Sequence, residues 1–271
     1  MPTFETPGHV KLDLIVPAGA VTVGTWGEPR VEVSVTTIRG DDASVQAAAE
    51  TRIEAVERGG RHEVSVRVPK REGRLGIFGR SPELLVAIRC PEAADLELTT
   101  HSADLDARGP LGEVAVRSAS GDVTAGDAES LSFTTASGDL VAGAVSGSLT
   151  TKSASGDVAV RSVVGPCTVS TVSGDVRLGS TTMLAAVTTV SGDVELDAVE
   201  GGTRVSCVSG DVRVATRPGL ALWIDVQSVS GSVTSDLEVG GATANAEGQV
   251  ELRVRTVSGD VRITRAAPVA G

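Results

Sequence analysis

Aromatic side chains are nearly absent from this chain of 271 residues: they make up 2% of it, and tyrosine does not occur. The few that exist are scattered, at Phe4, Trp26, Phe78, Phe133 and Trp223. Sugar-binding grooves are usually lined with aromatic rings, so this composition argues against one. It also predicts a core of Val, Leu and Ala in regular layers, which suits a narrow coil with little room inside.

Basic charge and long apolar runs are lacking as well. The formal net charge is −11, which disfavours binding to nucleic acid or to an anionic membrane surface. No apolar run approaches the length that spans a bilayer, so neither a transmembrane helix nor membrane insertion is expected. The opening segment, residues 1–6, has neither the basic region nor the apolar region of a secretion signal.

Residues that commonly carry chemistry are scarce. The 3 cysteines, Cys90, Cys167 and Cys207, form no Cys-x-x-Cys pair, so neither a zinc site nor a disulfide framework is indicated. A reduced, cytoplasmic compartment is the simplest interpretation. The 3 histidines avoid the repeats described below, and no nucleophile elbow or His-Glu-x-x-His motif occurs. We therefore expect no enzyme, no catalytic residue and no cofactor.

The chain does contain a short motif, Ser-Gly-Asp-Val, that recurs between residues 102 and 261. The steps between successive corner serines are equal to within a single residue, except for the last two, which are longer. A fixed period of about 18 residues indicates a solenoid, in which each repeat buries its apolar face against its neighbours. The corners start at Ser102 (a degenerate copy), Ser120, Ser137, Ser155, Ser173, Ser191, Ser209, Ser230 and Ser258.

Each repeat reads as one coil. Apolar residues alternate after the corner, as in Val194 and Leu196, then a turn with glycine leads to a second strand with inward residues such as Val187. We therefore predict an all-β fold, a parallel β-solenoid of about 18 residues and two strands per coil. Small polar residues stack just before the corners, and the hydroxyl of a threonine there can bond the neighbouring coil: Ser118, Thr135, Ser153, Thr171, Thr189 and Cys207.

Residues 1–92 lack the repeat and are predicted to form an α+β cap with one helix, followed by the solenoid over residues 93–271. Strands are expected at residues 10–16, 20–26, 31–38, 62–68 and 84–88. A helix is expected over residues 43–56, with Asp41 or Asp42 as N-cap, Val45 on its apolar face and Gly59-Gly60 as its stop. The basic, glycine-rich residues 69–80 read as a surface loop. Such a cap would cover the exposed edges of the first coil.

One aspartate per coil occupies the same place after the corner glycine: Asp104, Asp122, Asp139, Asp157, Asp175, Asp193, Asp211 and Asp260. We interpret them as corner formers, whose side chains accept hydrogen bonds from corner backbone N–H groups. The alternative is a Ca²⁺ site between coils. It would use Asp122, Asp139, Asp157, Asp175, Asp193 and Asp211, although Ca²⁺ needs six or more oxygen ligands. Outside this column, Arg177, Glu195 and Arg213 should stack with alternating sign.

The sequence resembles a bacterial β-strand-repeat family of unknown function whose members are often labelled adhesins. The likeness covers nearly the whole chain. It rests on residues 1–7, 49–54, 222–228 and 254–261 together with the Ser-Gly-Asp-Val coils. The resemblance implies a parallel β-solenoid with an amino-terminal cap, and it implies no catalytic residues.

These observations favour a non-enzymatic scaffold that binds a protein partner through a repetitive face. The stretched last steps place a longer loop near residues 236–249, where a binding face is common. An uncovered carboxy-terminal end would also allow end-to-end self-association. The alternative is a polysaccharide-active or Ca²⁺-dependent surface β-helix protein.

Overall fold

The computed structural model describes residues 1–69, 82–237 and 249–266. Strands make up 69% of the described residues, and one helix accompanies them. That helix is too short and too polar to cross a membrane. The chain divides into two compact units, Met1–Ala142 and Gly143–Gly271. The boundary expected near residue 92 falls within the first unit and stays a prediction.

The described residues of the first unit form the helix and ten complete strands, and an eleventh strand begins there. In chain order they are β1 (Thr3–Glu5), β2 (His9–Trp26), β3 (Arg30–Thr37), α1 (Asp42–Glu50), β4 (Arg52–Arg58), β5 (Arg61–Arg67), β6 (Leu84–Pro91), β7 (Asp95–Arg108), β8 (Leu111–Arg117), β9 (Val123–Ala125), β10 (Ala128–Ser137) and β11 (Leu140–Val145).

Strand β2 joins the amino-terminal residues to the coils. It pairs in parallel with β7 along most of its length, and on its other side with β5 and then β6. The two strands expected at residues 10–16 and 20–26 are therefore one long strand. Its partner changes from β5 to β6 near Gly19, whose φ is +116° and where a Cβ would collide with the backbone of Leu84. Leu12 and Val21, on either side of this point, are fully buried.

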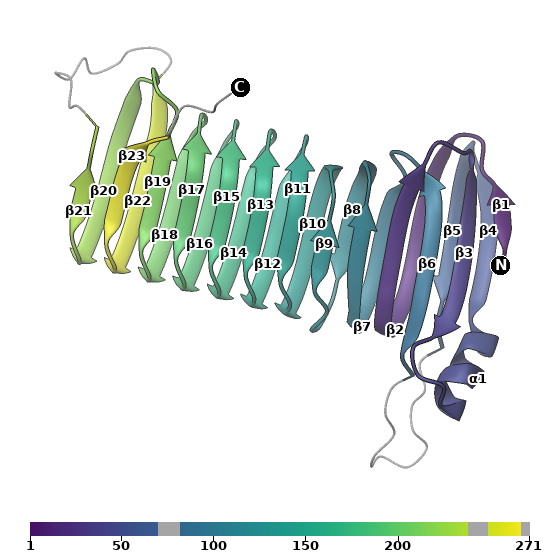
Figure 1. The fold of residues 1–271 in the computed structure, drawn as a ribbon. Helices are drawn as coiled ribbons and strands as arrows, with labels where there is room; N and C mark the ends of the chain where they lie inside the picture. Colours follow the sequence, from purple (N-terminus) through teal and green to yellow (C-terminus); the bar gives the residue numbers. More distant parts are fainter. Residues whose placement is uncertain (70–81, 238–248, 267–271) are drawn as a thin grey trace. The chain divides into compact units, whose positions relative to one another are not determined.

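Antiparallel strands form the outer edge of the first unit (Figure 1). β3 runs antiparallel to β6, β1 to β3, and β4 to β5. Nearly all of β4 is exposed, and its sequence, Arg-Ile-Glu-Ala-Val-Glu-Arg, places charged residues of both signs along it. Charged side chains on an edge strand oppose pairing with another chain.

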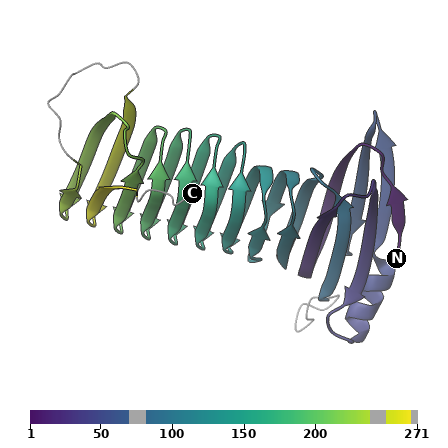
Figure 2. The same cartoon turned by 45° about the horizontal axis from the view of Figure 1, so that its top comes forward.

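The predicted helix is half right. Asp41 is the N-cap and its carboxylate accepts a hydrogen bond of 2.7 Å from the Ser44 N–H. The helix packs against β3 (Figure 2), but it ends at Glu50, and residues 52–58 form β4 instead. Both Gly59 and Gly60 have positive φ, so they make a tight hairpin turn rather than a helix stop. Pairing with β5 thus overrides the helical spacing, and Val45 faces solvent.

The second unit is a stack of coils, each with one strand on either side. Its strands are β12 (Leu149–Ser155), β13 (Val158–Val163), β14 (Cys167–Ser173), β15 (Val176–Thr181), β16 (Ala185–Ser191), β17 (Val194–Val199), β18 (Thr203–Ser209), β19 (Val212–Thr216), β20 (Leu222–Ser230), β21 (Val233–Ser235), β22 (Val250–Ser258) and β23 (Val261–Arg265).

Parallel pairing in this unit follows the predicted coil period. Val158 pairs with Val176, Val176 with Val194, and Val194 with Val212, so the offset is constant from coil to coil. All four side chains are almost completely buried. Burying a Val or Leu side chain contributes about 1.5–3 kcal/mol, so the repeated inward column supplies much of the stability of the stack.

The last two coils are out of chain order, which the sequence did not indicate. β22 lies between β18 and β20, and β23 lies between β19 and β21 (Figures 1 and 2). Val261 therefore pairs with Val212, and Val233 becomes the outer neighbour of Val261. The long final step, from Ser230 to Ser258, is a return into the stack and not a longer coil. Residues 238–248 of the expected late loop lie outside the described part of the chain.

The corner glycines of this unit have no room for a side chain. Gly174, Gly192 and Gly210 have φ values of +136°, +135° and +145°. At each, a Cβ would collide with the carbonyl oxygen of the preceding corner glycine. Glycine is therefore needed both for the backbone conformation and for the close approach of successive coils.

We predict that Gly192→Ala lowers the free energy of unfolding by about 1–3 kcal/mol, because a non-glycine residue would be strained at this φ and would clash. The matched control is Gly40→Ala, where φ is not in the left-handed region and nothing lies near the added Cβ. Urea unfolding of both variants measures the difference. Equal stabilities for the two would contradict the assigned corner geometry.

Candidate functional site

Three hydrogen bonds link successive Ser-Gly-Asp corners of the second unit. Between two coils of the second unit, the Asp193 carboxylate accepts a bond of 2.8 Å from the backbone N–H of Asp211. The Val194 N–H donates to the Asp211 carbonyl over 2.9 Å, and the Gly192 N–H donates to the Ser209 carbonyl over 3.1 Å. The aspartate side chain thus acts as a third acceptor beside two backbone carbonyls.

The same carboxylate-to-amide bond repeats along both units, and we call this series the aspartate ladder. The predicted corner role is confirmed, but the N–H belongs to the next coil and not to the aspartate's own corner. Even the degenerate corner at Asp104 takes part. The donor–acceptor pairs are Asp122–Asp104 and Asp139–Asp122 at 3.0 Å, Asp175–Asp157, Asp193–Asp175 and Asp211–Asp193 at 2.8 Å, Asp260–Asp211 at 2.9 Å, and Ser232–Asp260 at 2.8 Å.

The ladder stacks like charges, and this has a cost. Carboxylates at the strand spacing of about 4.8 Å repel by about 1 kcal/mol in water. Asp175 and Asp193 are exposed, so solvent screens them. Each N–H donated to a carboxylate is a charge-assisted hydrogen bond, which offsets part of the repulsion. At the last such pair, the N–H of Ser232 lowers the pKa of Asp260.

The Ca²⁺ alternative finds no ready-made cluster. Within residues 1–69, 82–237 and 249–266, no group of three or more His, Cys, Asp or Glu side chains is arranged to hold a metal ion. All six candidate aspartates are members of the aspartate ladder, each separated from the next by a whole coil. A chain of single carboxylates offers far fewer oxygens at one point than Ca²⁺ requires.

The polar column before the corners behaves differently from its prediction. The Ser118 hydroxyl accepts a bond of 2.6 Å from the Gly121 N–H, and the Thr171 hydroxyl donates to the Ser173 carbonyl over 3.2 Å, both within their own corner. The Cys207 thiol lies 3.7 Å from the Gly210 carbonyl of its own corner and 3.8 Å from the Gly192 carbonyl of the neighbouring coil. The expected bond between coils was therefore wrong for Thr171, because the tight corner brings a closer partner. The hydroxyls of Thr135, Ser153 and Thr189 are buried without a partner among the described residues.

The thiols are poorly suited to chemistry. Cys90, Cys167 and Cys207 are free and buried. Burial raises the pKa of Cys90 and of Cys167 to about 12, and it also raises the pKa of Cys207. Since the thiolate is the nucleophile, these side chains are protonated and unreactive near neutral pH.

An exposed apolar column follows the aspartate ladder in the second unit, and the sequence reasoning missed it. Its members are the outward valines that precede successive corner serines, and they are between 46% and 82% exposed. The recurring motif Val-Ser-Gly indicates this column, but in the sequence it marks only the end of the second strand of each coil. We call this set the valine column, in stacking order: Val172, Val190, Val208, Val257 and Val229.

The predicted column of alternating charge is confirmed. Arg177 pairs with Glu195, and Glu195 with Arg213, in the parallel register. The Arg177 guanidinium donates to the Glu195 carboxylate over 3.0 Å. Burial and the neighbouring Glu195 raise the pKa of Asp197, which lies on the same strand, β17.

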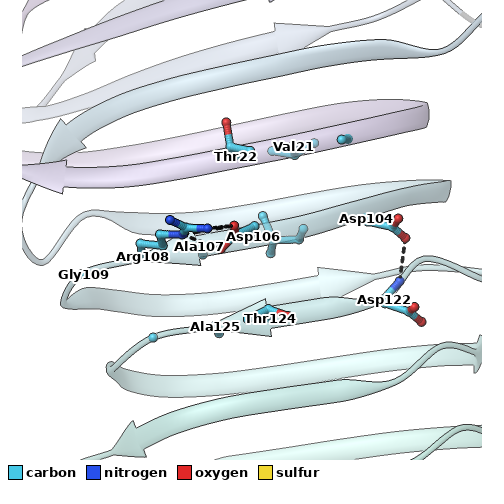
Figure 3. Close-up of a pocket in the computed structure, with 13 residues that line it drawn as sticks. Val21, Thr22, Asp104, Asp106, Ala107, Arg108, Gly109, Asp122, Thr124 and Ala125 are labelled. Atoms are coloured by element: carbon cyan, nitrogen blue, oxygen red, sulfur yellow. Dashed lines mark hydrogen bonds and ion pairs between the residues drawn. The ribbon is translucent and has the colours of Figure 1, made fainter. Parts of the chain in front are cut away.

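A shallow hollow of about 580 Å³ lies on the outer face of the first unit (Figure 3). Thr22, Asp106 and Thr124 stand in one row across β2, β7 and β9. Arg108 donates to the Asp106 carboxylate over 2.7 Å, and this lowers the pKa of Asp106. The hollow is lined by no histidine or cysteine, and its central carboxylate is already paired. Of the loop predicted at residues 69–80, all but Pro69 lies outside the described residues.

The described residues form parallel strands that stack coil on coil through the aspartate ladder, and no cluster of reactive side chains lies among them. These features define a β-repeat protein. The family model for the toastrack domain, DUF4097, matches residues 18–264, and this chain belongs to that family. No curated protein matches the sequence.

Solved bacterial structures are similar to the chain at low identity. A "putative adhesin" from Parabacteroides merdae shares 12% identity with a TM-score of 0.41, over 97% of this chain and 94% of that one. A "putative adhesin" from Bacteroides fragilis shares 15% identity with a TM-score of 0.37, over 97% of this chain and 95% of that one. A "putative cell adhesion protein" from Clostridium sporogenes shares 11% identity with a TM-score of 0.24, over 96% of this chain and 94% of that one. At these TM-scores the likenesses carry no argument about function.

We predict that Asp193→Asn changes the free energy of unfolding by less than about 0.5 kcal/mol, because the amide oxygen can accept the same bond from Asp211. Asp193→Ala should cost about 0.5–1.5 kcal/mol, because it removes the acceptor. Urea unfolding distinguishes the two.

If Asn were as destabilising as Ala, the negative charge would be required and the corner account would be contradicted. A rise in the melting temperature of the parent protein with added Ca²⁺ would point to a bound cation instead.

Proposed function

We propose that this chain is a non-enzymatic, parallel β-solenoid that acts as an interaction scaffold for a protein partner. It has an amino-terminal cap and coils of about 18 residues and two strands. The observation that carries the proposal is the valine column. Single exposed apolar residues are ordinary on protein surfaces. A column of them at a spacing of about 4.8 Å forms a continuous apolar strip, and such strips mark interaction sites.

The chemistry around the valine column indicates the kind of partner. Each valine precedes the corner serine and glycine, so the aspartate ladder runs beside the column. A partner with an apolar ridge flanked by Lys or Arg would complement both columns. The net charge of −11 acts in the same direction and against nucleic acid.

The corner hydrogen bonds support a scaffold by fixing the surface before binding. Two backbone bonds and one carboxylate bond per step hold the outward side chains of the second unit in register. Binding then costs little ordering of the protein, which favours affinity.

Two observations support the absence of catalysis. Acid–base chemistry needs groups whose environments push their pKa values apart, whereas the aspartates of the ladder accept the same bond in the same corner. Burial also keeps the thiols of Cys90 and Cys167 protonated. The charged edge strand β4 supports the role of the amino-terminal residues as a cap.

The test is a pull-down of the tagged chain from lysate of its own cells, read by mass spectrometry, with the triple variant Val172→Thr, Val190→Thr and Val208→Thr. Threonine keeps the β-branched shape and strand preference while replacing a methyl group with a hydroxyl. We expect a protein recovered with the parent chain to be lost with the triple variant.

The matched control is Val141→Thr with Val164→Thr, two valines of similar exposure outside the valine column. This variant should keep the partner. Recovery of the same partner by all three proteins would contradict binding at the valine column, and loss with the control alone would place the site elsewhere. Circular dichroism of each variant shows that it has folded.

A further inference from the structure

The outermost coil of the second unit, β20 and β21, shows its core side to solvent. The described residues pair β20 with β22 and β21 with β23, on one side only. Ile224 and Val233 occupy inward positions of the coil, yet they are 40% and 49% exposed. Their partners in the next coil, Leu252 and Val261, are buried. This coil therefore carries exposed apolar residues that a further strand packed beside it would bury.

The backbone of β20 is open on the same side. The Val250 N–H donates to the Ala221 carbonyl over 2.9 Å, and Val250 is in register with Leu222. In a parallel ladder, residues that alternate along the strand bond to the same neighbour. Trp223, Asp225 and the odd-numbered residues after them thus face β22. Ile224, Val226 and Ser228 direct their N–H and C=O groups to the open side.

We propose that a second copy of this chain covers this edge, through a two-fold axis at Val226 that pairs β20 antiparallel with its counterpart. β20 spans Leu222–Ser230, and Val226 is its central residue. An axis at this position pairs the strand along its full length. It also makes Val226 a hydrogen-bonded pair with itself, since its N–H and C=O both face the partner.

The side chains are self-complementary in this register. Trp223 would stand opposite Val229 of the second copy, on the outer face. Val229 is 82% exposed and Trp223 is 46% exposed, and pairs of an aromatic with a β-branched residue stabilise antiparallel strands. Asp225 would stand opposite Gln227, so no charge meets its like. An axis at Asp225 would instead bring two carboxylates together.

A second copy meeting through the same edge is favoured over a head-to-tail chain. A head-to-tail contact would need an edge strand of the first unit, and the described ones are β1, which has only 3 residues, and β4, which is lined with Arg and Glu. Edges of that kind resist pairing. A two-fold contact uses the apolar edge twice and closes, whereas a head-to-tail contact would grow into a filament.

The first experiment is sedimentation equilibrium of the purified full chain over a dilution series. We expect the mass of two chains for the parent protein and of one chain for Val226→Pro. Proline removes an N–H that faces the open side, so the coil's own bonds to β22 remain. Val229→Lys should also give one chain, because it removes the contact opposite Trp223.

Val190→Lys is the matched control: it makes the same change at an internal coil of the valine column, and it should stay a dimer. Melting curves of all variants show that they have folded. Because purified chain alone is used, failure here leaves the partner pull-down unaffected, and failure of the pull-down leaves this result unaffected.

The register is tested by cross-linking. Asp225 and Gln227 of opposing copies would form a non-hydrogen-bonded pair, with Cα atoms about 4.5 Å apart, within disulfide range. A mixture of the Asp225→Cys and Gln227→Cys variants should form a disulfide-linked dimer under mild oxidation. Asp225→Cys alone should form much less.

A monomeric parent chain at every concentration would overturn the proposal. A dimer that survives both Val226→Pro and Val229→Lys would do the same, as would larger species that grow with concentration. Equal cross-linking of the mixture and of Asp225→Cys alone would refute the axis at Val226.

Discussion

Each unit depends on one interaction, the hydrogen bond from the backbone N–H of a corner aspartate to the carboxylate of the aspartate in the neighbouring coil. At a tight corner the backbone cannot satisfy every N–H with a carbonyl, and an unpaired N–H is costly. The carboxylate supplies the missing acceptor. It can do so only if the corner recurs at a fixed interval and a glycine allows the coils to approach closely. The repeated phrase is therefore a consequence of the contact between coils.

The same constraint decides what faces inward and outward. Each coil is held at strand spacing from the next, so side chains stack in columns. The interior is filled mostly by Val, Leu and Ala, as the near absence of aromatics suggested, although Phe133 is also fully buried. The outer face repeats the outward residues of the motif, so a valine lies beside an aspartate in successive coils. Identical corners repeat one environment, and this repetition is the basis on which we propose a binding surface here.

Much of this could be read from the sequence, and the failures have physical causes. The constant period of the corners predicted the parallel register of Val158, Val176, Val194 and Val212, which depends on local alternation. The order of the last coils could not be read, because Val261 pairs with Val212 across a long stretch of chain. The helix was extended too far because helical spacing and a hairpin strand compete over residues 52–58, and only pairing with β5 decides between them. The valine column was overlooked because alternation marks a residue as outward without saying how exposed it is.

The most direct test of the corner interaction is residue-resolved amide hydrogen exchange at neutral pH. The Asp175, Asp193 and Asp211 side chains lie at solvent-accessible corners, where an amide bonded only to water would exchange quickly. We expect their N–H groups to be protected to a similar degree as the strand amides of β15 and β17. Rapid exchange at these three amides, with the strands still protected, would show that the carboxylates do not hold the coils together.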